Sequence, residues 1–528
     1  MRYLLHDVFT KTVVKYPSNI AIICENGQRI TYRELDKLAN QYAHLLLHLK
    51  QNTREYPYVG IISSVHANSI ACILASLKIG CAYIPLDEYS PVERLKHIIK
   101  NTQLDVIAVD PYWYNTFSEL FNEPEISKVI LLDDTNLILN EKIISYAKVL
   151  SQPKSNIPVY NQVSDDLAYI LHSSGSTGIP KGIMLTHRNA RTFVDWMQKE
   201  FQIQQHDKIM SRAPLKFDLS IFDIFNTFNA GASLICYNWN IRREGNQKHL
   251  DYVDLLVKEK ATILYTTPST FISLLNRGNL GSTSTSLRTI MYAGEPFPIP
   301  HLRKLHSVLP HTKIANIYGP TETNIITYYW IDSIPNDDNA SIPLGTAVED
   351  TEIIVVNEEE KRLCAPCELG ELWCRGGTVT IGYLGLEEKT KEHLVLSPFH
   401  KYPAYFWRTG DFGFRDSTGC LHYRGRKDHM IKVKGFRIEI GEVECAISGY
   451  PGIDEFVVVA KPDTKYGNRL YCYFSSINNQ TLSIDDIFQY TKKKLPEYMI
   501  PYSFIQLEVL PKTSSGKIDR VSLQMKEL

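Results

Sequence analysis

Residues 167–182 read LAYILHSSGSTGIPKG. A short apolar run is typical of a buried strand. Here the run LAYIL leads into residues 172–182, which hold three glycines, four hydroxyl side chains and one lysine. A glycine-rich turn at the end of a strand can point backbone N–H groups at an anion, and hydroxyls and a lysine add further donors. The glycine-rich loop (residues 172–182) therefore predicts a phosphate site.

The glycine-rich loop has two other interpretations besides a phosphate site. A P-loop phosphotransferase needs the pattern G-x-x-x-x-G-K-[ST]. That interpretation fails, because Lys181 follows Pro180 and precedes Gly182. A plain surface turn, however, is also built from glycine, serine and threonine. The choice between a turn and a phosphate site depends on the rest of the chain.

Short β-rich apolar runs recur on both sides of this loop, separated by stretches that can form helices. They are YVGIISS, CAYIPL, VIAVD and VILLD before it, and KIMSRAP, ASLICY, TILYTTP, TIMYAG and KIANIYG after it. Near-continuous apolar strands alternating with helices are typical of parallel sheets that are covered on both faces. We therefore predict an α/β fold in which βα-alternating subdomains with mostly parallel sheets form a large N-terminal region.

One helix is predicted in detail at residues 31–49. The segment opens with TYRE, in which Thr31 can cap the first amide groups and Glu34 can reach back to form a capping box. Apolar residues then recur at helical spacing, which predicts one amphipathic helix.

The pattern changes from about residue 346. TEIIVVNEEEKR and GELWCRGG predict a small β-rich subdomain. After GRKDHMIKVKG, a helix at residues 442–449 and the strands FVVVAKP and LYCYFSS predict a small α+β domain. With 528 residues, at least two domains are expected, and we place them at 1–425 and 426–528. The charged, polar linker predicts that the small C-terminal domain is mobile.

Composition narrows the class of protein. Lys and Arg total 57 against 58 Asp and Glu, a net charge of -1, which gives no broad footprint for nucleic acid or anionic lipid. Neither a signal peptide nor a membrane-spanning run is evident, so we expect a cytoplasmic protein. A C-x-x-C pair, Cys364 and Cys367, lies near a third thiol, Cys374, which could suggest zinc. No second ligand pair follows at zinc-finger spacing, so we favour packed or surface thiols over a metal site.

Further motifs decide how the glycine-rich loop is interpreted. NIYGPTE (316–322), WRTGD (407–411), GRKD (425–428) and SGKIDR (515–520) follow it in this order. Together they resemble the adenylate-forming superfamily. LKIGCAYIPLD, FDLS, GELWCRGGTVTIGYL, VKGFRIEIGEVE and LPEYMIP also resemble adenylation domains of the nonribosomal peptide synthetase type. The resemblance covers the whole chain and implies that a carboxylate attacks the α-phosphate of ATP, after which a thiol takes the acyl group.

The resemblance implies a nucleotide site with ATP and Mg²⁺. The implied ATP-binding residues are Ser173, Ser174, Gly175, Ser176, Thr177, Gly178, Lys181, Asn316, Tyr318, Gly319, Thr321, Asp411, Arg426 and Lys517. Glu322, with Thr177, is implied to hold Mg²⁺, a hard cation that prefers oxygen ligands. Tyr318 offers a flat face to adenine, and Asp411 can accept both ribose hydroxyls with help from Arg426.

Four residues are implied to be catalytic: Lys517, Lys181, Thr177 and Glu322. Lys517 carries the adenylation step as a point charge between the substrate carboxylate and the α-phosphate. Asp428 stands at the family's hinge, so the small domain would present Lys517 and then turn the face around Gly435 towards the site. A turn residue is the plainer interpretation of Asp428, and both can hold.

The substrate is implied to be an amino acid, because Asp218 in FDLS matches the aspartate that pairs with an α-ammonium group. Without an amine to neutralise, that buried carboxylate would be costly. The implied substrate-binding set is Asp218, Leu219, Phe222, Tyr265, Met291, Ala293, Gly294, Ile317, Ile325 and Ile326. Beyond Asp218 and Lys517 this pocket has no charged side chain, which favours a small apolar substrate. The set resembles that of stand-alone L-proline-activating enzymes, so proline is the leading hypothesis; its apolar members could equally be core residues.

The chain ends eight residues after Arg520, from which we expect the acceptor to be the phosphopantetheine thiol of a separate peptidyl carrier protein. Two alternatives stay open: an acyl-CoA or aryl-CoA ligase of the same superfamily, and a catalytically silent nucleotide-binding homologue. The loop departs from the family at His172, where tyrosine is frequent, and at Ser173, where threonine is frequent. A packed imidazole is the favoured interpretation of His172.

Overall fold

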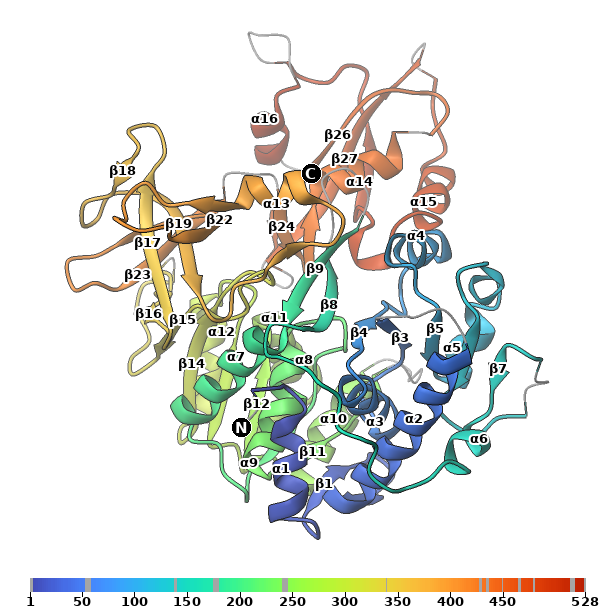
Figure 1. The fold of residues 1–528 in the computed structure, drawn as a ribbon. Helices are drawn as coiled ribbons and strands as arrows, with labels where there is room; N and C mark the ends of the chain where they lie inside the picture. The colour runs from blue at the N-terminus through green and yellow to red at the C-terminus, as the bar shows by residue number, and fades with distance from the viewer. Residues whose placement is uncertain are drawn as a thin grey trace.

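A computed structural model shows two large mixed sheets, a smaller β-rich sheet and a C-terminal region (Figure 1). The structure describes residues 3–52, 58–136, 140–173, 180–239, 246–338, 340–426, 430–433, 436–448, 450–463, 467–477, 480–512 and 518–526. The C-terminal region runs from β24 (Met430–Val433) to α16 (Arg520–Met525), and it lies at one end of the molecule in Figure 1.

The first sheet has nine strands in the order β16-β15-β14-β13-β12-β10-β11-β1-β2. Its strands are β1 (Ile20–Ile23), β2 (Arg29–Thr31), β10 (Lys208–Met210), β11 (Ser233–Ile235), β12 (Ile263–Thr266), β13 (Thr289–Tyr292), β14 (Lys313–Tyr318), β15 (Thr327–Trp330) and β16 (Thr346–Ala347). All neighbours from β1 through β11, β10, β12 and β13 to β14 are parallel. The carboxyl ends of these strands therefore meet at one edge.

The second sheet has eight strands in the order β20-β9-β8-β4-β3-β5-β6-β7. They are β3 (Tyr58–Ile62), β4 (Ala82–Pro85), β5 (Val106–Val109), β6 (Lys128–Leu131), β7 (Ile143–Ile144), β8 (Leu167–Ser173), β9 (Lys181–Thr186) and β20 (Gly382–Tyr383). The strands from β8 to β7 are parallel, whereas β9 runs antiparallel to β8. Every residue of β4 and β5 is buried, as their unbroken apolar sequences predict.

Helices cover and separate these sheets. They are α1 (Asp7–Lys15), α2 (Tyr32–Asn52), α3 (Ala67–Lys78), α4 (Val92–Thr102), α5 (Pro111–Thr116), α6 (Tyr146–Leu150), α7 (His187–Glu200), α8 (Leu219–Ile221), α9 (Thr227–Ala230), α10 (Gln247–Lys258), α11 (Pro268–Arg277), α12 (Ile299–Val308) and α13 (Glu387–His393). One apolar cluster contains Leu46 of α2, Leu74 of α3, Phe193 of α7, Ile61 of β3 and Tyr265 of β12. The two sheets therefore share a core.

The predicted capping box of α2 is present. The Thr31 hydroxyl accepts the Glu34 backbone N–H at 3.2 Å, and the Glu34 carboxylate accepts the Thr31 N–H at 2.8 Å. These two bonds satisfy amide groups that lack a partner within the helix.

The β-rich sheet is antiparallel, in the order β18-β17-β19-β22-β21, with β23 also paired to β22. Its strands are β17 (Thr351–Asn357), β18 (Arg362–Leu363), β19 (Gly370–Gly376), β21 (Leu394–Leu396), β22 (Tyr405–Arg415) and β23 (Leu421–Arg426). The predicted segments 351–362 and 370–377 contain β17 and β19, which are neighbours within this sheet.

The C-terminal region mixes strands and helices. Its elements are β24 (Met430–Val433), β25 (Phe436–Glu439), α14 (Ile440–Ile447), β26 (Ile453–Asp463), β27 (Gly467–Ser476), α15 (Ile484–Lys492), β28 (Ser503–Gln506) and α16 (Arg520–Met525). The predicted α/β class, the mostly parallel sheets, the β-rich part and the α+β C-terminal part are confirmed. The boundary at 425/426 and the mobility of the small domain stay predictions. Among the described residues, no helix is both long and apolar enough to cross a bilayer.

Candidate active site

The glycine-rich loop joins two antiparallel strands, β8 and β9, rather than a strand and a helix. Ser173 and Lys181 face each other across this pair at the base of the loop. The Ser173 hydroxyl is buried and has no hydrogen-bond partner within the part of the chain that the structure describes. A buried hydroxyl without a partner is costly unless a ligand satisfies it. Ser174, Gly175, Ser176, Thr177 and Gly178 lie outside the described residues.

Lys181, at the start of β9, is buried against two groups. Its ammonium donates to the Glu439 carboxylate of β25, with 2.7 Å between Nζ and Oε1. The same ammonium lies 5.7 Å from the centre of the Tyr383 ring. A buried ammonium needs a negative partner. In this arrangement the C-terminal region supplies it.

Glu322, in the turn after β14, is 1% exposed. Its Oε1 accepts a hydrogen bond of 2.7 Å from the Tyr383 hydroxyl. Tyr383 therefore stands between the predicted metal ligand, Glu322, and the predicted phosphate ligand, Lys181. A carboxylate beside a cluster of phosphate-binding groups suits a hard cation such as Mg²⁺.

Two predicted nucleotide ligands, Tyr318 and Arg426, converge on the carboxylate of a third, Asp411 in β22. The Tyr318 hydroxyl donates to Oδ2 at 2.6 Å, and Arg426 Nη1 lies 2.9 Å from Oδ1. Burial, followed by the neighbouring Asp411, raises the pKa of Tyr318 well above its usual value, so the phenol stays a donor. The pair of β22 with β23 places Asp411 directly opposite Arg426.

The remaining predicted nucleotide residues flank this cluster. Asn316 lies on β14, and its side-chain amide donates to the carbonyl of Pro343 at 2.7 Å. Thr321 lies in the turn after β14. Gly319 starts that turn, where a Cβ atom would lie 1.5 Å from the backbone oxygen of Asn324. Glycine is therefore required by the close approach of two backbone segments.

The predicted substrate pocket gathers at the carboxyl ends of the parallel strands of the first sheet. Tyr265 of β12 is directly opposite Met291 of β13 in the parallel register. Phe222 meets Tyr265 edge to face, with 5.4 Å between ring centres. Leu219 is partly buried. The other apolar members of the predicted set are at most 5% exposed and belong to the shared core; they are Phe222, Tyr265, Met291, Ala293, Ile317, Ile325 and Ile326. The predicted set is thus brought together, and its members also pack the core.

Asp218 precedes α8 at the rim of this group. Burial raises the pKa values of Tyr169 and Tyr265, and the negative charge of Asp218 raises both further. Asp218 therefore lies close to two neutral phenols. Phe222–Asn226 forms a π-helical turn directly after α8, an irregularity that is frequent at functional sites. Gly294, after β13, has φ +92, which favours glycine.

The C-terminal region packs against the FDLS segment. Phe436 of β25 lies 5.1 Å from Phe217, ring centre to ring centre, and stacks on Tyr498 at 3.8 Å. The Tyr498 hydroxyl donates to Asp87 at 3.2 Å, and Asp87 is ion-paired with Lys216. A second pair, Arg94 with Glu442, joins α4 to α14.

His172, the sixth residue of β8, lies next to this interface and is partly buried. Burial, with a smaller effect of Arg94, lowers its pKa to about 3. The imidazole is therefore neutral at physiological pH and is not a cationic phosphate ligand. This agrees with a packing role.

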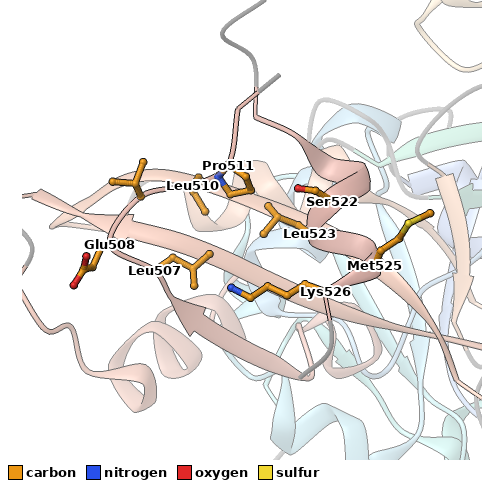
Figure 2. Close-up of a pocket in the computed structure, with 9 residues that line it drawn as sticks. Leu507, Glu508, Leu510, Pro511, Ser522, Leu523, Met525 and Lys526 are labelled. Carbon is orange, nitrogen blue, oxygen red and sulfur yellow. The ribbon is translucent and has the colours of Figure 1, made fainter. Parts of the chain in front are cut away.

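The two remaining predicted residues, Lys517 and Asp428, lie outside the described residues, as does Gly435. The stretches that flank residues 513–517 are described. Figure 2 shows the shallow groove between Leu507–Pro511 and α16, lined by Leu507, Leu510 and Leu523. None of its nine lining residues belongs to the predicted site.

Sequence reasoning missed three residues that the structure places at the site: Glu439, Tyr383 and Asp87. Each belongs to a segment that carried the family resemblance, VKGFRIEIGEVE, GELWCRGGTVTIGYL and LKIGCAYIPLD respectively. The motifs could therefore have suggested them. Their partners, however, are far away in sequence, and only the fold brings them together.

Comparison with known proteins agrees with this geometry. Residues 9–384 match the AMP-binding enzyme family, and residues 442–517 match the AMP-binding enzyme C-terminal domain. The chain is 31% identical to an L-proline--[L-prolyl-carrier protein] ligase of Pseudomonas fluorescens, with 98% of each chain covered. It is also 32% identical to bacitracin synthase 1 of Bacillus licheniformis over 98% of this chain but 9% of that synthase.

Two solved structures share the fold. An NRPS protein containing adenylation and PCP domains aligns over 98% of this chain and 84% of its own, with a TM-score of 0.81 and 21% identity. The amide bond synthetase McbA from Marinactinospora thermotolerans aligns over 98% and 99%, with a TM-score of 0.83 and 19% identity. Fold and site together define an AMP-binding enzyme. The chain belongs to the AMP-binding enzyme family, and the predicted membership of the adenylate-forming superfamily is confirmed.

Proposed function

We propose that this enzyme activates a small apolar amino acid, with L-proline as the first candidate, using ATP and Mg²⁺. The products are the aminoacyl-adenylate and pyrophosphate, and the aminoacyl group then passes to the phosphopantetheine thiol of a separate peptidyl carrier protein. The observation that carries the proposal is Asp218 at the rim of an apolar group of side chains. The full-length likeness to an L-proline carrier-protein ligase supports both the substrate and the acceptor.

The nucleotide has an anionic triphosphate and a neutral ribose, and the site offers partners for both. At the base of the glycine-rich loop, Lys181 offers an ammonium, and Ser173 offers a buried hydroxyl that has no hydrogen-bond partner among the described residues. Asp411 is the acceptor for the ribose hydroxyls, held in place by Tyr318 and Arg426. Glu322 would hold Mg²⁺, which neutralises phosphate charge when it is bound.

The substrate carboxylate must approach another anion, so positive charge has to lie between them. Lys517 is proposed for that role. The α-ammonium pairs with Asp218 at the opposite end of the amino acid. Between these two ends, Phe222, Tyr265 and Met291 leave an apolar environment in which a charged or amide side chain would have no partner. Proline is small and apolar and meets these conditions.

Amino-acid-dependent ATP/pyrophosphate exchange tests the first half-reaction across the twenty standard amino acids and pipecolate. We expect the strongest signal from proline, with weaker signals from valine and pipecolate, since one methylene in an apolar pocket discriminates by about 1 to 3 kcal/mol. A strongest signal from glutamate, lysine or tryptophan would contradict the substrate assignment. An absence of exchange with every amino acid would contradict the activity.

The acceptor is tested separately. Radiolabelled proline is offered with a phosphopantetheinylated carrier protein, with the apo carrier or with coenzyme A. Transfer to the holo carrier alone supports the proposal. Transfer to coenzyme A at an equal or greater rate would favour a CoA ligase.

A further inference from the structure

The hairpin between β22 and β23 brings together three side chains that the proposed reaction does not use. They are Asp416, Cys420 and His422, and each is partly exposed. One ligand atom from each, a carboxylate oxygen, a thiol sulfur and an imidazole nitrogen, lies within 4.8 Å of the other two. Oxygen, sulfur and nitrogen donors of these types are the ligands that zinc binds in proteins.

The hairpin holds the Asp416 carboxylate in one orientation. Its Oδ1 accepts hydrogen bonds from the backbone N–H groups of Thr418 and Cys420 and from the Thr418 hydroxyl, at 2.7 to 3.0 Å. Its Oδ2 is directed to His422 Nε2, 2.9 Å away. Outer hydrogen bonds of this kind orient metal-ligating carboxylates. One oxygen is therefore fixed by the turn while the other faces the imidazole.

The imidazole is also held in place. The His422 ring stacks on Phe414 of β22, with 4.8 Å between ring centres and 4° between planes. A ring confined in this way loses little freedom when it binds a ligand. The three donors come from seven consecutive residues of one antiparallel hairpin, so their spacing does not depend on contacts with distant parts of the chain.

A zinc ion requires the three donor atoms to lie closer together than the 4.8 Å limit that this cluster meets. Zn–N and Zn–O bonds of about 2.0 Å and a Zn–S bond of about 2.3 Å place tetrahedral ligand atoms roughly 3.3 to 3.6 Å apart. The 2.9 Å separation between Asp416 Oδ2 and His422 Nε2 needs to widen by a few tenths of an ångström. The exchange is chemically simple: the thiol releases one proton to solvent, the neutral imidazole binds zinc through Nε2 and keeps its proton on Nδ1, and the Asp416 carboxylate exchanges its hydrogen bond to His422 for a bond to zinc.

We propose that Asp416, Cys420 and His422 form a zinc site, with water as the fourth ligand. The site is separate from the proposed active site. Asp411 and Arg426 form the other end of the β22–β23 pairing, and five residues of extended chain between Asp411 and Asp416 span about 17 Å. Zinc would therefore cross-link the hairpin and leave amino-acid activation nearly unchanged.

Titration of the chelator-treated full-length chain with zinc chloride, followed by calorimetry, tests the site. We expect one equivalent of zinc to bind with a micromolar or tighter dissociation constant. Cys420→Ser and His422→Gln should each weaken this binding at least tenfold. Cys367→Ser is the matched control, because Cys367 is an exposed thiol of the same sheet region that lies outside the cluster. This variant should bind zinc like the parent chain.

Cobalt gives a second readout. Bound Co²⁺ should show a sulfur-to-cobalt charge-transfer band in the near ultraviolet, lost in Cys420→Ser and kept in Cys367→Ser. Absence of one-to-one binding, or loss of the band in Cys367→Ser alone, would overturn the proposal. Proline-dependent exchange is measured on the same variants; since they should fold and exchange normally, a failed zinc site and a failed activity assignment give different results.

Discussion

Lys181 Nζ lies 2.7 Å from Glu439 Oε1, which joins the base of the glycine-rich loop to the C-terminal region. Both side chains are nearly buried, with exposed fractions of 5% and 11%. A buried ammonium needs one close anion, and the proposed substrate brings a triphosphate to the same place. The ammonium has three N–H donors but a single positive charge, so Glu439 and a phosphate oxygen compete for it. We therefore expect binding of ATP to weaken the ion pair with Glu439.

Glu439→Gln should favour the first half-reaction, adenylation, and slow the second, transfer to the carrier protein. Without the competing carboxylate, ATP meets a Lys181 that is easier to recruit, so the KM for ATP in pyrophosphate exchange should fall roughly fivefold. The substitution also weakens the contact between β25 of the C-terminal region and the base of the glycine-rich loop. If this contact holds the C-terminal region in the position needed for transfer to the carrier protein, transfer should slow by a similar factor. Exchange and single-turnover transfer assays measure the two effects.

Glu349→Gln is the control for this comparison. Glu349 makes an ion pair with Lys199 on the surface, and a surface ion pair contributes little to the stability of the fold. Neither the KM for ATP nor the rate of transfer to the carrier protein should change in Glu349→Gln. If Glu439→Gln raises the KM for ATP instead, Glu439 does not compete with the phosphate.

Tyr318→Phe should weaken ATP binding with little change in kcat. The variant keeps the ring and loses the hydroxyl that donates to Asp411 at 2.6 Å. Loss of a hydrogen bond to a charged group predicts a rise in the KM for ATP of about tenfold. Tyr402→Phe, which removes an exposed hydroxyl bonded to Arg375, should leave the KM unchanged. Equal effects of the two variants would argue against a ribose site at Asp411.

Met291→Ala should relax the substrate preference towards larger apolar amino acids such as leucine. Met291 is fully buried, and truncation opens a cavity that costs about 2 to 5 kcal/mol of stability. Met210→Ala is the matched control, since Met210 is equally buried on the same sheet but belongs to a different apolar cluster. Both variants should lose stability in urea, and only Met291→Ala should change the exchange profile. A profile that changes equally in both would remove Met291 from the pocket.

Asp223, next to Phe222 in the π-helical turn, should make stability depend on pH. Burial raises its pKa to about 7, although the N–H groups of Arg212 and Ala213 and the Ser211 hydroxyl oppose the shift. In the unfolded chain the carboxyl loses its proton near pH 4. The folded state therefore holds an extra proton between about pH 4 and pH 7. The stability this provides is complete below about pH 4 and is lost as the pH rises through 7.

The asparagine side chain of Asp223→Asn stays neutral at every pH. The Tm of this variant should therefore rise relative to the Tm of the parent chain as the pH is raised from 5 to 8. Asp207→Asn is the control. Although Asp207 is buried, hydrogen bonds from Arg288 and neighbouring groups lower its pKa, so its contribution is lost only in acid. Its Tm deficit should be constant between pH 5 and pH 8. A constant difference for Asp223→Asn as well would show that Asp223 is already ionised at pH 5.

The sequence predicts most of the architecture, because the parallel strands are continuous apolar runs. β5 and β12 are each four residues long, fully buried and lie where the runs VIAVD and TILYTTP predict them. Local signals such as the Thr31–Glu34 capping box are equally readable, since both partners lie within one turn. The motifs also point to residues that the fold brings together, as Tyr318 and Asp411 show.

Contacts between distant segments could not be predicted in this way. Glu439 is 258 positions from Lys181, and Tyr383 is 61 positions from Glu322. Nothing in the local pattern of a charged or aromatic residue identifies its partner across such separations. The state of the C-terminal region was equally hidden, because the balance between Glu439 and a phosphate at Lys181 depends on the ligand rather than on the chain.

Lys517→Ala should abolish most of the adenylation activity while leaving the chain folded. The resemblance of SGKIDR to the family motif assigns Lys517 the charge that bridges the substrate carboxylate and the α-phosphate. Its removal withdraws a charge-assisted contact from the transition state and should cost on the order of 3 kcal/mol or more, which is roughly a hundredfold in rate. Proline-dependent pyrophosphate exchange measures this loss.

Lys512→Ala removes a nearby exposed lysine that is paired with Glu455 and should keep full activity. Transfer from preformed prolyl-adenylate to the carrier protein should be slowed much less, because that step no longer needs the charge between two anions. Undiminished exchange in Lys517→Ala would show that another cation performs this step.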